Sequence, residues 1–237
     1  MVEPIALGGL SAALALGARE HVALVGGGGK TTALFALGDQ LAGTIVLTTT
    51  TKMGRDRTDG RTVLFAPSDD DLLLALDHSP AVLAWGADGG HKAVGVAPEV
   101  CDHWFTIADN VVVEADGSRH RPFKAPRPFE PVVPSTTTLL LACVGADALG
   151  RVIADQCQRP LRVAAVAGCS PYLRLSPERL AKVLLSDRGS RKNCPESARF
   201  AVMVNMVTER ELGFLEELAG FLTEDTLLVT VAPFGSN

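Results

Sequence analysis

Residues 21–32, HVALVGGGGKTT, join a short apolar run to four glycines, a lysine and two threonines. Glycine lets the backbone turn its N–H groups toward an anion, and the start of a following helix adds partial positive charge. A lysine there can neutralise β- and γ-phosphates, and a threonine hydroxyl can bind Mg²⁺. We therefore expect a phosphate-binding loop made of Gly26, Gly27, Gly28, Gly29, Lys30, Thr31 and Thr32.

The loop is shorter than the common G-x-x-x-x-G-K-[ST] pattern, because Leu24 stands where that pattern has its first glycine. Leu24 fits the preceding strand, so the loop begins at Gly26 as a compact G-x-x-G-K-T element, similar to that of Mur-type peptide ligases. We expect Gly27 and Gly28 to tolerate substitution more readily than the residues that face a triphosphate. The alternative is a glycine-rich turn with an incidental lysine.

A second apolar run, residues 111–113, is followed by Glu114 and Asp116. Side chains alternate along a strand, so both carboxylates lie on one side if the strand continues through them. One could hold Mg²⁺, usually through water, and the other could orient or deprotonate a nucleophile. The alternative is a pair of solvated acids at the end of a strand.

Threonines and a lysine end the strand predicted at residues 44–50, in the stretch VLTTTTKM. Ligands gather at such strand ends in doubly wound sheets. We expect Thr50 to reach the metal and Lys52 to neutralise charge that develops in a transition state. The alternative is simple β-propensity with a solvated lysine.

A basic segment, SRHRPFKAPR (118–127), follows directly on the acids. It fits an anionic second substrate or a γ-phosphate, with Arg119 stabilising the transferred group and Lys124 binding the nucleotide. The alternative is a solubilising loop. A second basic cluster, RGSRK (188–192), lies in a Gly/Ser loop, where a solvated loop is the favoured interpretation.

Composition excludes several classes of protein. The 237-residue chain is 47% hydrophobic with a net charge of −5, which gives no electrostatic basis for binding nucleic acid. Five scattered cysteines without C-x-x-C argue against a disulfide framework or a zinc site and favour the cytoplasm. The apolar run at residues 5–18 lacks a preceding cation and is too short to span a bilayer, so we expect no membrane partner.

Short apolar runs alternate with helix-like stretches along the chain. The strands are expected at residues 21–25, 44–50, 62–66, 81–85, 92–96, 110–118, 137–145, 199–207 and 226–231. The helices are expected at residues 5–18, 31–42, 68–79, 98–108, 176–185 and 208–222. This alternation predicts a three-layer, P-loop NTPase-like α/β fold, with a mostly parallel sheet and helices on both faces. Residues 1–237 are expected to form a single nucleotide-binding domain, with a small β-hairpin inserted near residues 81–97 and an extended surface loop at 122–134.

The segments GGGGKTT, VLTTTTKM, VVVEADGSRHRPFKAP and FEPVVP, in that order, resemble the YqeC family. The resemblance implies a P-loop nucleotide-binding fold and an accessory role in the maturation of a selenium-dependent molybdenum hydroxylase. The residues that it implicates are Gly26, Gly29, Lys30, Thr31, Thr50, Lys52, Glu114, Asp116, Ser118, Arg119 and Lys124. Two positions depart from the family's pattern. Gln158 stands where a histidine is expected, and Thr208 stands where an acidic residue would recognise a guanine base. ATP is therefore expected rather than GTP.

These patterns predict a Mg²⁺-dependent protein that binds ATP and hydrolyses it or transfers its γ-phosphoryl group, with Lys30, Lys52, Glu114, Asp116 and Arg119 as the reactive set. One alternative is a nucleotide-gated chaperone or scaffold without turnover. It would dock on a molybdenum hydroxylase or a cofactor-insertion protein through residues 122–134. Ligase-like acyl-phosphate chemistry and a small-molecule kinase activity also stay open.

Overall fold

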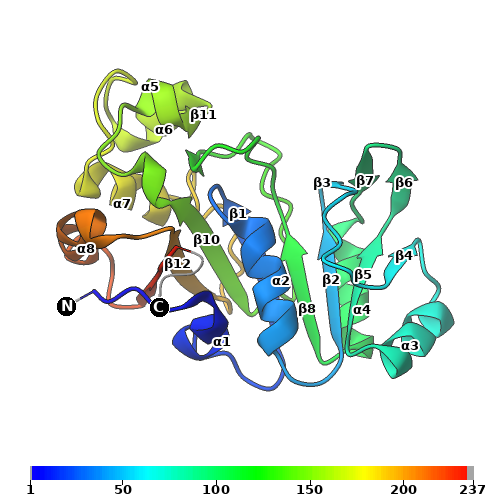
Figure 1. Cartoon of the computed structure of the whole chain (residues 1–237). Helices are drawn as coiled ribbons and strands as arrows, with labels where there is room; N and C mark the ends of the chain where they lie inside the picture. Colours follow the sequence, from blue (N-terminus) through cyan, green and yellow to red (C-terminus); the bar gives the residue numbers. More distant parts are fainter. Residues whose placement is uncertain (1, 234–237) are drawn as a thin grey trace.

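The computed structural model describes residues 2–233 and is built on one large sheet (Figure 1). Its strands are β1 (His21–Gly26), β2 (Ile45–Thr49), β4 (Val63–Phe65), β5 (Ala81–Trp85), β8 (Asn110–Glu114), β10 (Leu139–Gly145), β12 (Arg199–Asn205) and β13 (Thr226–Val231). They lie in the order β13-β12-β10-β1-β8-β2-β5-β4. All their pairings are parallel, which confirms the predicted parallel sheet.

Helices cover both faces of this sheet, because its central strands are apolar on both sides. Val22 and Leu24 of β1 pack against α2 (Lys30–Gln40), together with α1 (Leu10–Ala13). The alternate residues Ala23 and Val25 point to the opposite face. That face is covered by α3 (Asp69–His78), α4 (Pro98–Ile107), α7 (Pro177–Leu185) and α8 (Leu212–Ala219). The predicted three-layer architecture is confirmed.

The helices begin where their capping signals predict. Ser68 accepts a hydrogen bond from the backbone N–H of Asp71 at the start of α3, and Ser176 accepts one from Arg179 at the start of α7. Pro98 opens α4 in the same way that Pro177 opens α7, at a position where the missing N–H is not needed.

Two small sheets lie beyond the carboxyl ends of the large sheet's strands. The first joins β3 (Lys52–Gly54), β7 (Lys92–Val94) and β6 (Ala87–Gly89) in antiparallel pairs. A β-hairpin does lie within the expected region near residues 81–97, but β6 and β7 form it, because β5 stays in the large sheet. The second sheet pairs β9 (Phe123–Lys124) with β11 (Cys157–Gln158) in parallel.

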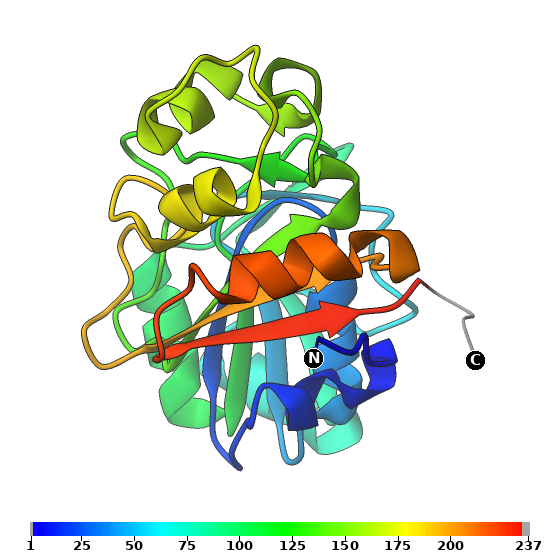
Figure 2. The same ribbon diagram turned by 90° about the vertical axis from the view of Figure 1, so that its left-hand side faces the viewer.

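Several short elements escape prediction from the sequence. They are α5 (Ile153–Gln156), α6 (Pro160–Ala167) and the 3-10 turn η2 (Ala146–Ala148). Two further 3-10 turns, η1 (Leu7–Gly9) and η3 (Glu209–Glu211), lie within the helices expected over residues 5–18 and 208–222. Figure 2, seen from the β13 side, shows the α5–α6 segment at the top of the molecule, above the sheet. The expected helix over residues 5–18 is reduced to η1 and α1, since the chain turns at Ala15 with φ 49°. Within residues 2–233, no helix is both long and apolar enough to cross a membrane.

The packing of α2 on the sheet predicts a large cost for truncating Leu34, which is fully buried. We expect Leu34→Ala to lower the free energy of unfolding by about 2–5 kcal/mol, because a cavity remains where the side chain was. Leu74→Ala is the matched control, since Leu74 is also helical but 62% exposed, and should change stability by less than about 0.5 kcal/mol. Urea unfolding measures both, and equal losses would contradict this account of the core.

Candidate functional site

The glycine loop lies at the centre of the large sheet, because β1 runs between β8 and β10. The loop follows β1 directly, and α2 begins at Lys30 with Gly29 as its N-cap residue. Gly26, Gly28 and Gly29 have φ angles of 92°, 71° and 108°, a region that residues with a side chain rarely adopt. The sequence therefore forms the predicted strand–loop–helix, with the start of α2 directed at the end of the sheet.

The protein's own backbone crowds this loop. A Cβ on Gly27 would lie 2.3 Å from the carbonyl oxygen of Arg121, and one on Gly28 would lie 2.1 Å from the backbone nitrogen of Gly145. The expectation that Gly27 and Gly28 tolerate substitution is therefore wrong. Their lack of a side chain lets residues 121–123 and the end of β10 pack directly on the loop.

Lys30 lies at the centre of a buried ionic cluster. Its ammonium nitrogen is 3.4 Å from Asp116 Oδ1 and 3.8 Å from Glu114 Oε1, and it donates a hydrogen bond of 2.7 Å to the carbonyl oxygen of Gly26. Burial would lower the pKa of Lys30, but the charges of Asp116 and Glu114 outweigh burial and raise that pKa. The lysine is therefore held in its charged form.

The two acids reach the loop by different routes. Strand β8 ends at Glu114, so the strand does not continue through both acids as expected. Glu114 Oε2 nevertheless accepts a 2.8 Å hydrogen bond from Thr31 Oγ1, and both oxygens of Asp116 lie 3.1 Å from the backbone nitrogen of Gly26. Burial raises the pKa of Glu114 despite the opposing charge of Lys30.

Thr31 and Glu114 are the two groups best placed for Mg²⁺. Hydroxyl and carboxylate oxygens are the hard ligands that this ion prefers, and it commonly takes only one or two from the protein while phosphates and water supply the rest. Such a set is smaller than a dedicated metal cage, and no cage of three or more His, Cys, Asp or Glu side chains occurs within residues 2–233. The donor chemistry thus fits Mg²⁺ held jointly with a phosphate.

Lys124 is buried, although it belongs to a segment expected to be an exposed loop. Its ammonium lies 3.0 Å from Asp116 and 3.0 Å from Glu130, and it donates to the carbonyl oxygen of Gly117. The guanidinium of Arg159 donates to both carboxylate oxygens of Glu130, at 2.8 and 2.9 Å. Instead of presenting Lys124 to a ligand, the structure places it as the link between Asp116 and Glu130.

The segment from residue 122 to 134 is therefore anchored rather than free. The backbone nitrogen of Gly145 donates to the carbonyl oxygen of Pro122, and Lys192 donates to the carbonyl oxygen of Glu130. Thr50 Oγ1 donates to the carbonyl oxygen of Val132, at 2.8 Å. The hydroxyl of Thr50, expected at the metal, thus holds this segment in place.

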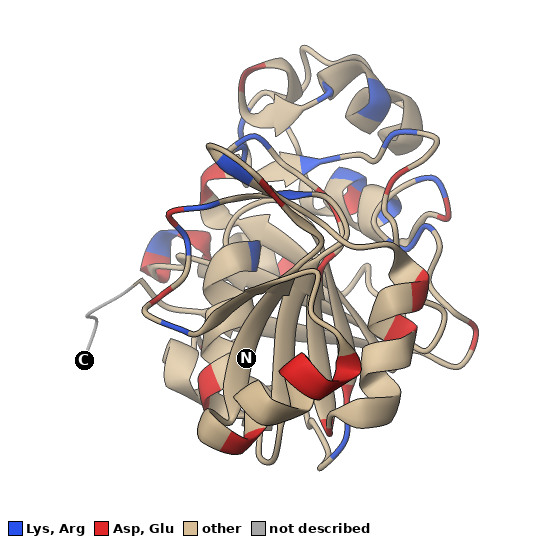
Figure 3. Ribbon diagram, turned by 90° about the vertical axis from the view of Figure 1, so that its right-hand side faces the viewer, with Lys and Arg blue, Asp and Glu red and all other residues tan. Residues whose placement is uncertain are grey.

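Other predicted residues are not drawn into the cluster. Lys52 begins β3 in the small antiparallel sheet and is exposed, and the exposed Arg119 lies in a turn with φ 51°. Thr32 is half-buried in the first turn of α2. Figure 3 shows most Lys and Arg positions in the upper part of the molecule, on the side where the strands end. Lys52 and Arg119 stay candidates for charge neutralisation, but no contact joins either of them to Lys30.

Three important residues were not recognised from the sequence as parts of the site. Glu130 and Arg159 extend the ionic cluster. The side-chain amide of Asn205 packs against Gly29, so that a Cβ on Gly29 would lie 2.3 Å from Asn205 Nδ2. The available signals were the FEPVVP stretch, the Arg-Pro pair before α6 and the polar residue ending an apolar strand. Each signal marks its residue as a candidate for the site, but none predicts which side chain or backbone that residue contacts.

The thiols of the three buried cysteines are protonated at neutral pH. Cys143 lies on β10 beside the cluster, and burial raises the pKa of its thiol to about 12. Burial likewise raises the pKa of Cys101 and Cys157 to about 12. Only the thiolate is an effective nucleophile or metal ligand, so these three thiols are inert at neutral pH.

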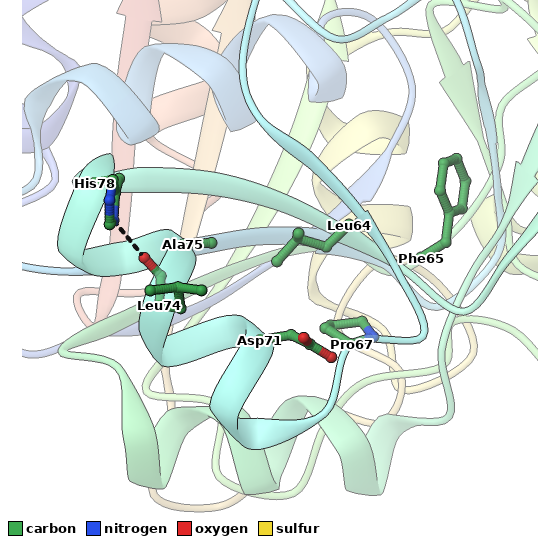
Figure 4. Close-up of a pocket in the computed structure, with 7 residues that line it drawn as sticks. All are labelled: Leu64, Phe65, Pro67, Asp71, Leu74, Ala75 and His78. Atoms are coloured by element: carbon green, nitrogen blue, oxygen red, sulfur yellow. Dashed lines mark hydrogen bonds between the residues drawn. The ribbon is translucent and has the colours of Figure 1, made fainter.

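A separate pocket of about 450 Å³ lies between β4 and α3 at the edge of the sheet (Figure 4). The residues that line it are Leu64, Phe65, Pro67, Asp71, Leu74, Ala75 and His78. His78 Nδ1 is already hydrogen-bonded to the carbonyl oxygen of Leu74 within the same helix. None of the predicted site residues contributes to this pocket, so it is distinct from the glycine loop.

The crowding of the loop predicts that Gly28→Ala lowers stability strongly. Gly168 has a similar φ of 67° but open space around its Cβ position, so Gly168→Ala isolates backbone strain, about 1–2 kcal/mol. The collision with Gly145 should make Gly28→Ala at least about 2 kcal/mol costlier still. Urea unfolding of the two variants compares them, and equal losses would refute the crowding.

The ion pairs of the half-buried Glu130 predict a pH-dependent contribution to stability. Burial would raise the pKa of Glu130, but the hydrogen bond and charge of Lys124 and the charge of Arg159 hold it below its usual value. A carboxyl with a lowered folded-state pKa stabilises the fold above its unfolded pKa of about 4.3, and this stabilisation is lost as the pH falls through the folded value.

We therefore expect Glu130→Gln to lower the free energy of unfolding by about 1–2 kcal/mol at pH 7, with a smaller loss below about pH 4, because solvent partly screens these ion pairs. Glu178→Gln is the control, because Glu178 pairs with Lys182 on an exposed helix face and should show a much smaller effect. Unfolding curves from pH 3 to 8 provide the measurement. A loss that is constant across this range would mean that the ion pairs are not its source.

Comparisons with known proteins place this fold and site in a family. The family model described as YqeC protein matches residues 22–161, which include the glycine loop, both acids and Lys124. YqeC of Escherichia coli (strain K12) is 32% identical over 222 residues, covering 89% of this chain and 84% of that protein. No solved structure matches the chain. The chain therefore belongs to the YqeC family.

Proposed function

We propose that this protein binds a nucleoside triphosphate with Mg²⁺ at the glycine loop and hydrolyses it or transfers its γ-phosphoryl group. One observation carries the proposal: a charged Lys30, the Thr31 hydroxyl and two acids from the neighbouring strand end converge where a glycine loop meets the start of a helix. This combination suits a polyphosphate with its metal. An isolated glycine turn would need none of these partners.

The contacts of each residue in the cluster indicate the role that it would have in binding the nucleotide. Thr31 and Glu114 would hold Mg²⁺, which supplies positive charge to the phosphate oxygens when it is bound. Lys30 would exchange its hydrogen bond with the carbonyl oxygen of Gly26 for one with a phosphate oxygen. Asp116 would keep its place, because Lys124 and the backbone N–H of Gly26 hold it from two sides.

ATP is the proposed nucleotide. In GTP-binding proteins, the carboxylate of an Asp recognises the guanine base. Thr208 stands where that Asp is expected in this chain. The structure shows the Thr208 hydroxyl donating to Glu211, at the start of the turn that leads into α8. Thr208 thus serves as a helix-start residue, which supports adenine over guanine as the base.

A second candidate, a nucleotide-gated scaffold, is favoured by a specific contact. Residues 121–123 pack directly on Gly27, so a ligand in the loop would press on the segment that follows, up to residue 134. That segment could report the state of the nucleotide to a partner. In the cell, we propose an accessory role in the maturation of a selenium-dependent molybdenum hydroxylase, supported by the family membership.

The test is calorimetric titration with Mg²⁺–ATP together with an assay of phosphate release. Lys30→Ala should weaken binding about tenfold or more and abolish phosphate release, because a charge-assisted contact to phosphate is lost. Thr31→Val keeps the shape of the side chain but removes its hydroxyl, so it should reduce the dependence on Mg²⁺ even if Lys30→Ala folds poorly. GTP in place of ATP should bind more weakly.

Lys182→Ala is the control, because Lys182 is an exposed lysine on α7 whose ion pair is with Glu178 in its own helix. It should match the wild type in both assays. Equal phosphate release by the wild type and a folded Lys30→Ala variant would refute the enzymatic proposal. Tight ATP binding by the wild type without release would instead support the scaffold.

A further inference from the structure

A second pocket, distinct from the glycine loop, lies between the segment after β9 and the helix α6. Its volume is about 370 Å³, within the usual range for a site that takes a small molecule. Pro126, Pro128, Leu161 and Val166 give it apolar walls. The pocket therefore offers apolar contact area to a compact ligand.

The same pocket is strongly basic. Arg127, Arg162, Arg188 and Lys192 line it, against one acid, Asp187. Within residues 2–233, none of these four cations forms an ion pair with a carboxylate, whereas the nearby Arg159 and Arg191 each have one. In a chain with net charge −5, such a cluster of unpaired cations is not explained by composition.

The protein's own contacts hold these cations together. Lys192 donates to the carbonyl oxygens of Arg127, Pro128 and Glu130, which fixes its ammonium at the pocket wall. Burial and the charge of Arg162 lower the pKa of Lys192, as like charges in close proximity require. The charge of Glu130 offsets this lowering only in part, and Lys124 and Arg159 already engage its carboxylate.

We propose that this pocket binds a small organic anion, a phosphate ester with an apolar body. The arginine side chains suit a phosphate, since the guanidinium fork donates two parallel hydrogen bonds to its oxygens. The apolar walls suit the rest of the molecule. The anionic second ligand is thereby assigned to Arg162 and Arg188 rather than to Arg119, while Lys192 adds only its charge because its three N–H donors already bind carbonyl oxygens.

The position of the pocket links it to the glycine loop. A narrow crevice beside Gly26, Asp116 and Lys124 shares Pro126 with the pocket. The ion pairs from Lys30 through Asp116, Lys124 and Glu130 also end at Arg159, directly before α6. The identification of this ligand as the second substrate rests on the proposed function; the binding of an organic phosphate does not.

The experiment titrates the full chain with phenyl phosphate and follows binding by calorimetry, with phenol and inorganic phosphate as the two half-probes. Phenyl phosphate should bind saturably and more tightly than either half-probe, because it uses both the cations and the apolar walls. The double variant Arg162→Gln/Arg188→Gln should weaken this binding about tenfold or more, through loss of charge-assisted hydrogen bonds.

Arg210→Gln is the matched control, because Arg210 is an exposed arginine in the turn before α8, and it should bind like the wild type. Lys30→Ala should also keep the binding, which separates this pocket from the nucleotide site. The proposal is overturned by an absence of saturable binding, by equal affinities in the wild type and the double variant, or by a loss of binding in a folded Lys30→Ala variant. A failure of ATP to bind would leave it standing.

Discussion

The ion pairs of Asp116 are the interaction on which the site depends. This buried carboxylate faces Lys30 on one side and Lys124 on the other, and it accepts hydrogen bonds from the backbone N–H of Gly26. A buried charge is tolerable only when such partners surround it. Because Gly26 and Lys30 come from the glycine loop and the start of α2, the carboxylate joins the chain after β8 to a segment that lies 90 residues earlier at Gly26.

Close backbone packing imposes the second constraint. The chain after Asp116 must turn back over the loop so that Lys124 can reach its carboxylate, and this brings residues 121–123 against Gly27. Only glycine fits between the two backbones. The four glycines thus serve the packing of the protein on itself as well as the approach of a phosphate, which gives the loop two independent reasons to lack side chains.

The ionic contacts also connect two regions of different chemistry. At the glycine loop, the cations and carboxylates compensate one another, which suits a metal-bound polyphosphate. In the pocket beside α6, the cations have no carboxylate partners, which suits a single organic anion. Glu130 lies between the two regions, since its carboxylate binds Lys124 and its carbonyl oxygen binds Lys192. Glu130 therefore contributes contacts to the structure of both regions.

The sequence by itself determined the parallel α/β sheet, the strand–loop–helix at Lys30 and the meeting of that loop with Glu114 and Asp116. Local apolar runs and the common edge of parallel strands are sufficient to predict these features. Only the tertiary structure decided that Lys124 is buried, that Thr50 holds the segment at Val132 and that Gly27 and Gly28 are constrained. These outcomes depend on long-range contacts made by irregular segments, and no local periodicity encodes which residue such a segment will meet.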